Sequence, residues 1–146
     1  MRGGFVPKPQ ALYLFAGLPR KSDVASYLQK AGWEVTQVDI LRSPSHDVSD
    51  PAVAESLVSK VAASVFKAVI ISPPCDTFTR VMFANDNGPK PLRTSLHARG
   101  FEWLGGNSAR KVKLGNFLAD LTFKVFAAQL RTEPGWAVVE FPEDLG

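Results

Sequence analysis

The sequence predicts a single α/β domain, residues 1–146, with a Rossmann-like, mainly parallel β-sheet flanked by helices. Short apolar runs alternate along the chain with segments whose apolar residues recur at helical spacing, which is the pattern of this fold class. The run at residues 67–72 is apolar on both faces, as in a covered parallel strand. A length of 146 residues fits one domain of ordinary size.

The chain begins with a predicted strand and helix. Residues 11–15 are apolar and aromatic and stop just before Gly17, as a buried strand that ends in a turn would. Ser22 and Asp23 can cap the first turn of the helix that follows. Gly32 stands where a left-handed residue is expected at the end of that helix.

A second strand and a second helix follow. Residues 33–40 predict the strand, which closes on Asp39. Asp50 and Pro51 form an N-cap followed by proline at the first helical position, and the helix is expected to run over residues 51–66. Its apolar stripe comprises Val53, Leu57, Val61 and Val65.

A long basic loop precedes the last helix and strand. Residues 73–110 contain four prolines, four glycines and no sustained period, and loops of this length are usually functional or disordered. Residues 73–113 carry seven Lys or Arg and three Asp or Glu, so their net charge is +4, against +3 for the whole chain. A helix is predicted over residues 111–130 and a strand over residues 136–141.

Composition excludes several classes of protein. No apolar run approaches the roughly 20 residues of a membrane-spanning helix, and the N-terminus lacks the apolar core of a secretory signal. One cysteine cannot form an internal disulfide, which fits a reducing, intracellular setting. His46 and His97 lack partner ligands at metal spacing, so no metal site is expected.

Four strand ends collect the residues with distinctive chemistry: Gly17, Asp39, Cys75 and Glu140. Ligands of parallel α/β sheets bind outside the carboxyl ends of the strands. Asp39 lies 22 positions after Gly17, close to the spacing of about 20 at which an acid reaches the ribose of a bound nucleoside. An acid at a strand end is also common as a cap or a solvated residue, and that interpretation of Asp39 stays open.

Cys75 follows two prolines, which restrict the backbone and would hold the thiol in a stiff turn as the chain leaves the sheet. A nucleophilic cysteine must ionise, and Arg80 in the same loop is a candidate source of positive charge. The alternative interpretation is a small buried hydrophobe, since unpaired cysteine is among the most buried residue types.

In chain order, the sequence carries L-F-A-G at 14–17, Asp39, D-V at 47–48, S-P-P-C at 72–75 and E-F-P at 140–142. This order resembles the DNA (cytosine-5) methyltransferases over residues 11–142. The most specific element is P-P-C followed two residues later by T-F-T. The resemblance implies an S-adenosylmethionine-binding half with its catalytic loop, incomplete relative to a full class I methyltransferase fold.

The resemblance also implies roles for individual residues. Cys75 would be the nucleophile, and Glu140 would be the acid that engages N3 of a target cytosine. The substrate would be double-stranded DNA, and the protein would be cytoplasmic or associated with DNA. The implied cofactor contacts are Phe15, Gly17, Asp39, Asp47 and Pro73, and the implied DNA contacts are Arg80, Lys90, Arg93 and Arg99.

The chemistry explains why a thiol and a carboxyl group are needed together. C5 of cytosine is a poor nucleophile until a thiolate adds at C6 and a carboxyl group stabilises the adduct at N3. The base must leave the helical stack to be reached. A basic loop that holds phosphates while it closes over the extruded base suits this reaction.

Departures from the family pattern leave two alternatives open. Pro19 replaces a second glycine, Phe141 replaces the asparagine that usually follows the glutamate, and Ser72 replaces a glycine. The chain stops at Gly146 without the family's recognition region. We therefore expect either that a partner or a second copy covers an open sheet edge, or that the protein is a divergent miniature or a truncated gene product. One alternative is a catalytically inactive module that binds DNA or protein, and the other is an unrelated nucleotide-binding domain.

Overall fold

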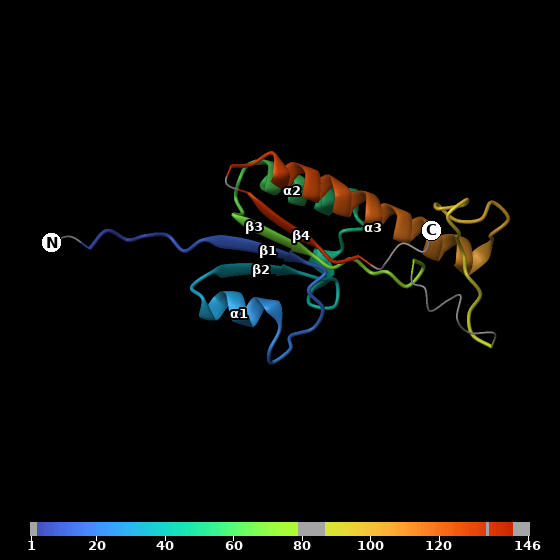
Figure 1. Ribbon diagram of the computed structural model, residues 1–146, viewed down its shortest axis with the longest axis horizontal. Coiled ribbons are helices and arrows are strands. Elements are labelled where there is room, and N and C mark those ends of the chain that lie inside the picture. The colour runs from blue at the N-terminus through green and yellow to red at the C-terminus, as the bar shows by residue number, and fades with distance from the viewer. Residues whose placement is uncertain (1–2, 79–86, 134, 142–146) are drawn as a thin grey trace.

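The computed structural model describes residues 3–78, 87–133 and 135–141, and in this part of the chain it shows one four-stranded, all-parallel sheet (Figure 1). The predicted α/β fold class is confirmed. The strands are β1 (Gln10–Leu14), β2 (Glu34–Val38), β3 (Ala68–Ile71) and β4 (Trp136–Val139). The helices are α1 (Val24–Lys30), α2 (Pro51–Ala62) and α3 (Gly106–Leu130), with a 3₁₀ turn η1 (Pro44–His46).

The strand order β2-β1-β3-β4 creates a point at which the chain reverses direction across the sheet. Leu12 of β1 lies opposite Thr36 of β2 and Val69 of β3, so β1 is paired on both edges. From β1 the chain moves outward to β2 and then crosses back to β3 on the other side. The gap between the ends of β1 and β3 is therefore the topological switch point, where open α/β sheets bind ligands.

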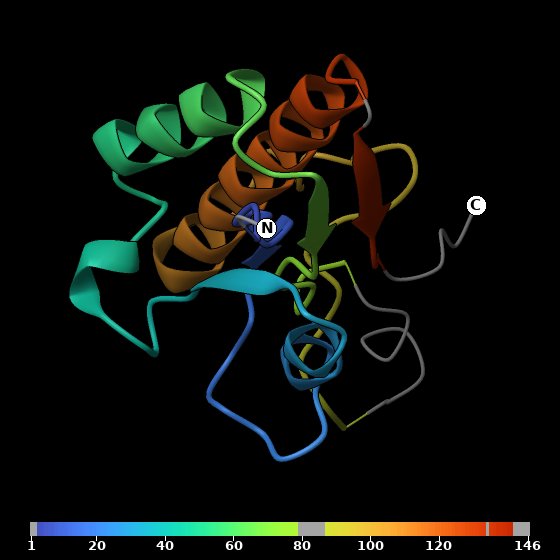
Figure 2. The same cartoon turned by 90° about the vertical axis from the view of Figure 1, so that its left-hand side faces the viewer.

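The two faces of the sheet are covered by different helices. α1 packs on one face, whereas α2 and α3 pack together on the other (Figure 2). All four strands run toward the same end of the molecule, and the 87–105 loop and the start of α3 lie beyond that end (Figure 1). The predicted basic loop and the strand ends are thus on one side.

The main core lies between the sheet and the pair α2 and α3. Leu12, Leu14 and Val125 are fully buried there, and burial of each such side chain contributes about 2 kcal/mol. Tyr13 points to the opposite face and packs with Ala25 of α1. In the described residues, no helix combines the length and the apolar character that crossing a membrane requires.

Predicted caps are present at two helix starts. Asp23 accepts a hydrogen bond from the Ser26 N–H at 2.9 Å, and Asp50 accepts one from the Ala52 N–H at 2.9 Å. Each satisfies a backbone donor that the first turn would leave unpaired. Gly32, with φ +89°, adopts the left-handed conformation predicted after α1.

Two predicted helix boundaries are wrong. α2 ends at Ala62 instead of residue 66, because Ser64 turns the chain with φ +61°, and Val65 is therefore outside the helix and exposed. α3 begins at Gly106 instead of residue 111. Gly105 is its N-cap and has no side chain that could cap the first turn, which removes the usual sequence signal.

Candidate functional site

The ends of β1 and β2 meet through Gly17 and Asp39. The Gly17 N–H donates to Asp39 Oδ2 at 2.8 Å, and the Leu41 N–H donates to Oδ1 at 2.8 Å. The Gly17 carbonyl in turn accepts from Arg42 Nε at 2.6 Å. The structure therefore brings together the two residues whose spacing suggested a nucleoside site. Both Asp39 oxygens already accept a backbone N–H, and each retains a lone pair for a ligand.

The backbone at the end of β1 has two residues in the left-handed region. Phe15 has φ +62°, which is uncommon for an aromatic residue, and its N–H donates to the Val38 carbonyl at 2.8 Å. Gly17 has φ +70°, and a Cβ added there would have no heavy atom within 4 Å. The turn after β1 is therefore strained at Phe15 and open above Gly17, and such strain clusters at functional sites.

Asp47 lies just after η1, which is joined to the end of β2. The Asp39 N–H donates to His46 Nδ1 at 3.4 Å. The Asp47 carboxylate accepts from the backbone N–H and the hydroxyl of Ser49, at 3.0 and 2.6 Å. Asp39 and Asp47 are thus on neighbouring segments at one end of the sheet, and both carboxylates take part in local turns.

The ends of β3 and β4 are joined by Glu140. Its N–H donates to the Ile71 carbonyl at 2.9 Å, and its Oε2 accepts from Ser72 Oγ at 3.3 Å. Pro73 is buried, whereas the Glu140 side chain is exposed. The carboxylate therefore lies beside Ser72, the residue that precedes the P-P-C segment.

A second contact joins β4 to the far side of Cys75. The rings of Phe78 and Phe141 meet edge to face, with centroids 5.1 Å apart. The Phe78 N–H donates to the Cys75 carbonyl at 2.9 Å, so residues 75–78 form a tight turn. Cys75 is half-buried in a segment that contacts the Glu140 region on both sides, at Ser72 and at Phe78. Phe141, the residue after Glu140, therefore packs against the segment that carries Cys75.

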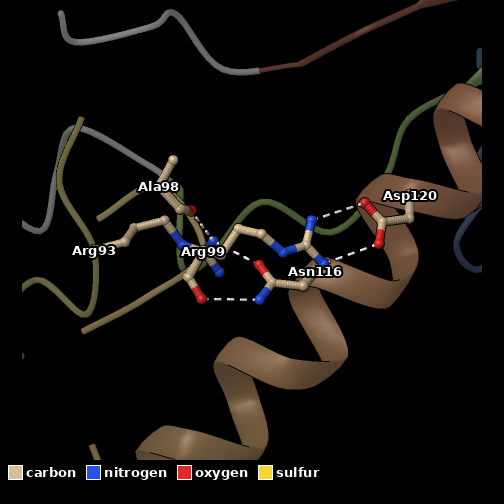
Figure 3. Close-up of polar contacts among 5 residues, drawn as sticks. All are labelled: Arg93, Ala98, Arg99, Asn116 and Asp120. Carbon is tan, nitrogen blue, oxygen red and sulfur yellow. Dashed lines mark hydrogen bonds and ion pairs between the residues drawn. The ribbon is translucent and has the colours of Figure 1, made fainter. Parts of the chain in front are cut away.

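Arg93 requires a correction, because it is buried instead of facing solvent. Figure 3 shows its contacts with Ala98 and Asn116. Its Nη1 donates to the Ala98 carbonyl at 2.6 Å and to Asn116 Oδ1 at 2.8 Å. Its Nε and Nη2 donate to the carbonyl and hydroxyl of Thr77, at 3.1 and 2.9 Å. Four of its five N–H donors are thus bonded inside the protein, and burial lowers its pKa from the ordinary value. In this structure Arg93 does not present its guanidinium to a phosphate.

The other predicted DNA contacts differ in their surroundings. Arg99 is exposed and forms a two-pronged ion pair with Asp120 at 2.9 and 3.0 Å (Figure 3). Hydrogen bonding between the two side chains raises the pKa of Arg99 and lowers the pKa of Asp120. Lys90 is exposed on the loop. Arg80 lies outside the described residues.

Sequence reasoning missed the contact between α3 and residues 72–78, which we call the cysteine loop. A Cβ on Gly115 would lie 2.9 Å from Thr77 Oγ1 and 3.3 Å from Arg93 Nη2. Glycine inside a helix costs about 1 kcal/mol relative to alanine, so its presence in α3 was a signal that something approaches closely. The next residue, Asn116, accepts a hydrogen bond from Arg93 through Oδ1 and donates one from Nδ2 to the Arg99 carbonyl.

The described residues contain no group of three or more His, Cys, Asp or Glu side chains that could hold a metal ion. A groove of about 640 Å³ is lined mainly by residues of β2, η1 and α2, including Thr36, His46 and Lys60. It does not include Cys75 or Glu140.

The fold defines the class: an α/β protein with a Rossmann-like, all-parallel sheet in the described residues. Comparison of the chain with protein-family models, curated proteins and solved structures finds no match.

Proposed function

We propose that this chain transfers a methyl group from S-adenosylmethionine to C5 of cytosine in DNA. The observation that carries the proposal is the double attachment of the cysteine loop to the β4 end, through Ser72 with Glu140 and through Phe78 with Phe141. A potential nucleophile and a carboxyl group therefore belong to adjoining segments at the carboxyl ends of β3 and β4. This pairing is what addition to a pyrimidine ring requires.

In the proposed reaction, the Cys75 thiolate forms a bond to C6 of the extruded cytosine. Glu140 holds the proton at N3 that accompanies this addition, so that the electron density moves to C5. S-adenosylmethionine, when bound, supplies the electrophilic methyl group. With the methyl group on C5 and S-adenosylhomocysteine released, a base from solvent removes the C5 proton and the C6–S bond breaks. N3 returns its proton to Glu140, and the thiolate and the methylated cytosine are released.

The residues near the switch point fit a nucleoside cofactor. The turn above Gly17 is open, and the Asp39 carboxylate at the end of β2 retains lone pairs that ribose hydroxyls can use. Phe15 lies beside this turn, and Pro73 lies at the end of the adjacent β3. Asp47, on the segment joined to Asp39 through His46, would meet the adenine amine.

Duplex DNA is the proposed substrate, and an intracellular setting goes with it. Lys90 and Arg99 are exposed. They belong to the 87–105 loop, which lies beyond the strand ends (Figure 1). The Arg99 pair with Asp120 is exposed, so a phosphate can compete for the guanidinium at little cost. Arg80 belongs to the same basic segment.

The proposal also includes a partner for the sheet edge. Within the described residues no strand pairs with the outer edge of β4, and Trp136 and Val138 on that strand are 67% and 60% exposed. Unpaired edges favour association. We expect sedimentation to show that the wild type is a dimer and that Val138→Lys is a monomer. If the wild type is a monomer and binds no partner protein through this edge, this part of the proposal is wrong.

Transfer of tritium from labelled S-adenosylmethionine to mixed-sequence duplex DNA tests the activity. Wild type is expected to incorporate label and Cys75→Ser to incorporate none, while calorimetry shows equal cofactor affinity for both. Absence of incorporation together with absence of cofactor binding would overturn the proposal.

The second candidate is a catalytically inactive module that binds DNA or protein. Pro19 and the two backbone hydrogen bonds already made by Asp39 favour it, because both reduce what the Gly17 turn offers a cofactor. DNA binding without cofactor binding would support this alternative. Binding of a nucleotide, with no binding of DNA or of S-adenosylmethionine, would indicate an unrelated nucleotide-binding domain.

A further inference from the structure

Arg93 is 6% exposed, although Lys90 and Arg99 of the same loop are exposed. A buried guanidinium loses its hydration and is tolerated only when protein groups replace the lost water contacts. Here the acceptors come from three places: Thr77 near Cys75, Ala98 of the 87–105 loop and Asn116 of α3. Arg93 therefore joins elements that are far apart in sequence.

The contacts of Arg93 reach the neighbours of both proposed catalytic groups, through Thr77 and Phe78. Its guanidinium lies over the Phe78 ring, 3.7 Å from the centroid, and Phe78 contacts Phe141, the neighbour of Glu140. Thr77, which accepts two of its hydrogen bonds, is two residues from Cys75. One side chain thus holds the turn that carries the thiol and braces the end of the strand that carries the carboxylate.

This cluster is separate from the packing that holds the fold together. Thr77, Phe78 and Arg93 do not belong to the hydrophobic core between the sheet and its helices. Gly115 leaves the space on α3 into which the Thr77 hydroxyl and the guanidinium fit. Loss of the Arg93 contacts is therefore expected to loosen the cysteine loop more than it loosens the domain.

We propose that Arg93 is a positioning residue that fixes the Cys75 turn against α3 and against the Glu140 end of β4. The inference rests on the proposed function for its effect on methyl transfer, but the anchoring itself does not. Misplacement of a reacting group by about 1 Å can cost on the order of a hundredfold in rate. Lysine cannot replace this arginine, because its point charge does not reach four acceptors in different directions.

The single cysteine of the chain makes the test direct, since a thiol reagent such as Ellman's reagent reports on Cys75 alone. Arg93→Lys removes the planar guanidinium but keeps a positive charge. Thr77→Val removes the Oγ1 acceptor with little change of side-chain shape. Arg131→Lys, an exposed arginine at the opposite end of α3, is the matched control. The measurements are the rate of thiol modification, the thermal midpoint, and kcat and KM for S-adenosylmethionine.

We expect Arg93→Lys and Thr77→Val to raise the rate of thiol modification at least about threefold and to lower kcat about tenfold or more. KM for the cofactor should stay within about twofold, and the control should match wild type. Unchanged thiol reactivity in both variants would overturn the inference, as would equal losses of kcat, cofactor affinity and thermal midpoint. If wild type transfers no methyl group, the proposed function fails, and the thiol rates still decide whether Arg93 anchors the loop.

Discussion

At the residue scale, the site depends on hydrogen bonds between positions distant in sequence. Gly17 and Asp39 were expected to share one end of the sheet because each follows a predicted parallel strand, and the structure joins them directly. The buried state of Arg93 could not be predicted in this way. An arginine in a basic loop has the same sequence signature whether it meets phosphate or four internal acceptors. Only Gly115, unexpected inside a helix, indicated a close approach.

Gly115→Ala tests that close approach. Alanine favours the helix by about 1 kcal/mol, but its Cβ would lie 2.9 Å from Thr77 Oγ1, and overpacking typically costs about 1–3 kcal/mol. We therefore expect the variant to be less stable than wild type, or equally stable with a displaced cysteine loop and faster thiol modification. Chemical denaturation and thiol rates measure the two effects.

Gly105→Ala is the control for this substitution, because Gly105 has φ −134° and no atom within 4 Å of an added Cβ. It should change stability by less than about 1 kcal/mol. A Gly115→Ala protein that is more stable than wild type, with unchanged thiol reactivity, would show that α3 does not press on the loop.

At the element scale, the strands and helices followed from periodicity, whereas their ends depended on local chemistry. Asp23 and Asp50 carry the carboxylates that cap α1 and α2, so these starts could be predicted. The start of α3 at Gly105 and Gly106 offers no polar side chain, and the early end of α2 depends on a serine in the left-handed region. Neither feature has a strong sequence signal.

The attachment of the basic loop to α3 through Arg99 and Asp120 should depend on pH. The pKa of Asp120 is lowered in the folded protein by its hydrogen bond with Arg99. The stabilisation is therefore complete above the unfolded pKa of about 3.9 and is lost as pH falls through the lower folded value. Asp120→Asn removes the ion pair and should be less stable than wild type at pH 7. The loss of stability should be small, because both side chains are exposed.

The measurement is the difference in unfolding free energy between wild type and Asp120→Asn as a function of pH. This difference should shrink toward zero as the pH falls below about 3.9. A difference that stays constant from neutral to acidic pH would mean that the ion pair contributes nothing and that the substitution acts through another contact.

At the scale of the whole molecule, strand order and charge distribution concentrate the distinctive features at one end. The sheet could be predicted as parallel from the apolar character of residues 67–72, but its order, and with it the switch point, required the structure. The excess positive charge lies in residues 73–113, and the described loop of that segment extends beyond the strand ends. The excess positive charge therefore lies at the end of the molecule that carries the proposed site.

This charge distribution predicts salt-dependent binding of duplex DNA. Each phosphate contact releases counterions, so two or three contacts should reduce affinity roughly 10- to 40-fold between about 50 and about 200 mM salt. Fluorescence anisotropy with a labelled duplex measures the dependence, and Lys90→Gln should reduce its slope. Affinity that is the same at both salt concentrations would exclude phosphate contacts as the basis of binding.

The central claim is that Cys75 attacks a cytosine that Glu140 engages. Mass spectrometry of the protein after incubation with S-adenosylmethionine and a duplex containing 5-fluorocytosine tests it most directly, because fluorine at C5 blocks release of the thiolate. We predict a covalent DNA adduct on Cys75 that requires the cofactor and is absent from Cys75→Ser. An unmodified Cys75 in a protein that binds both cofactor and DNA would contradict the claim.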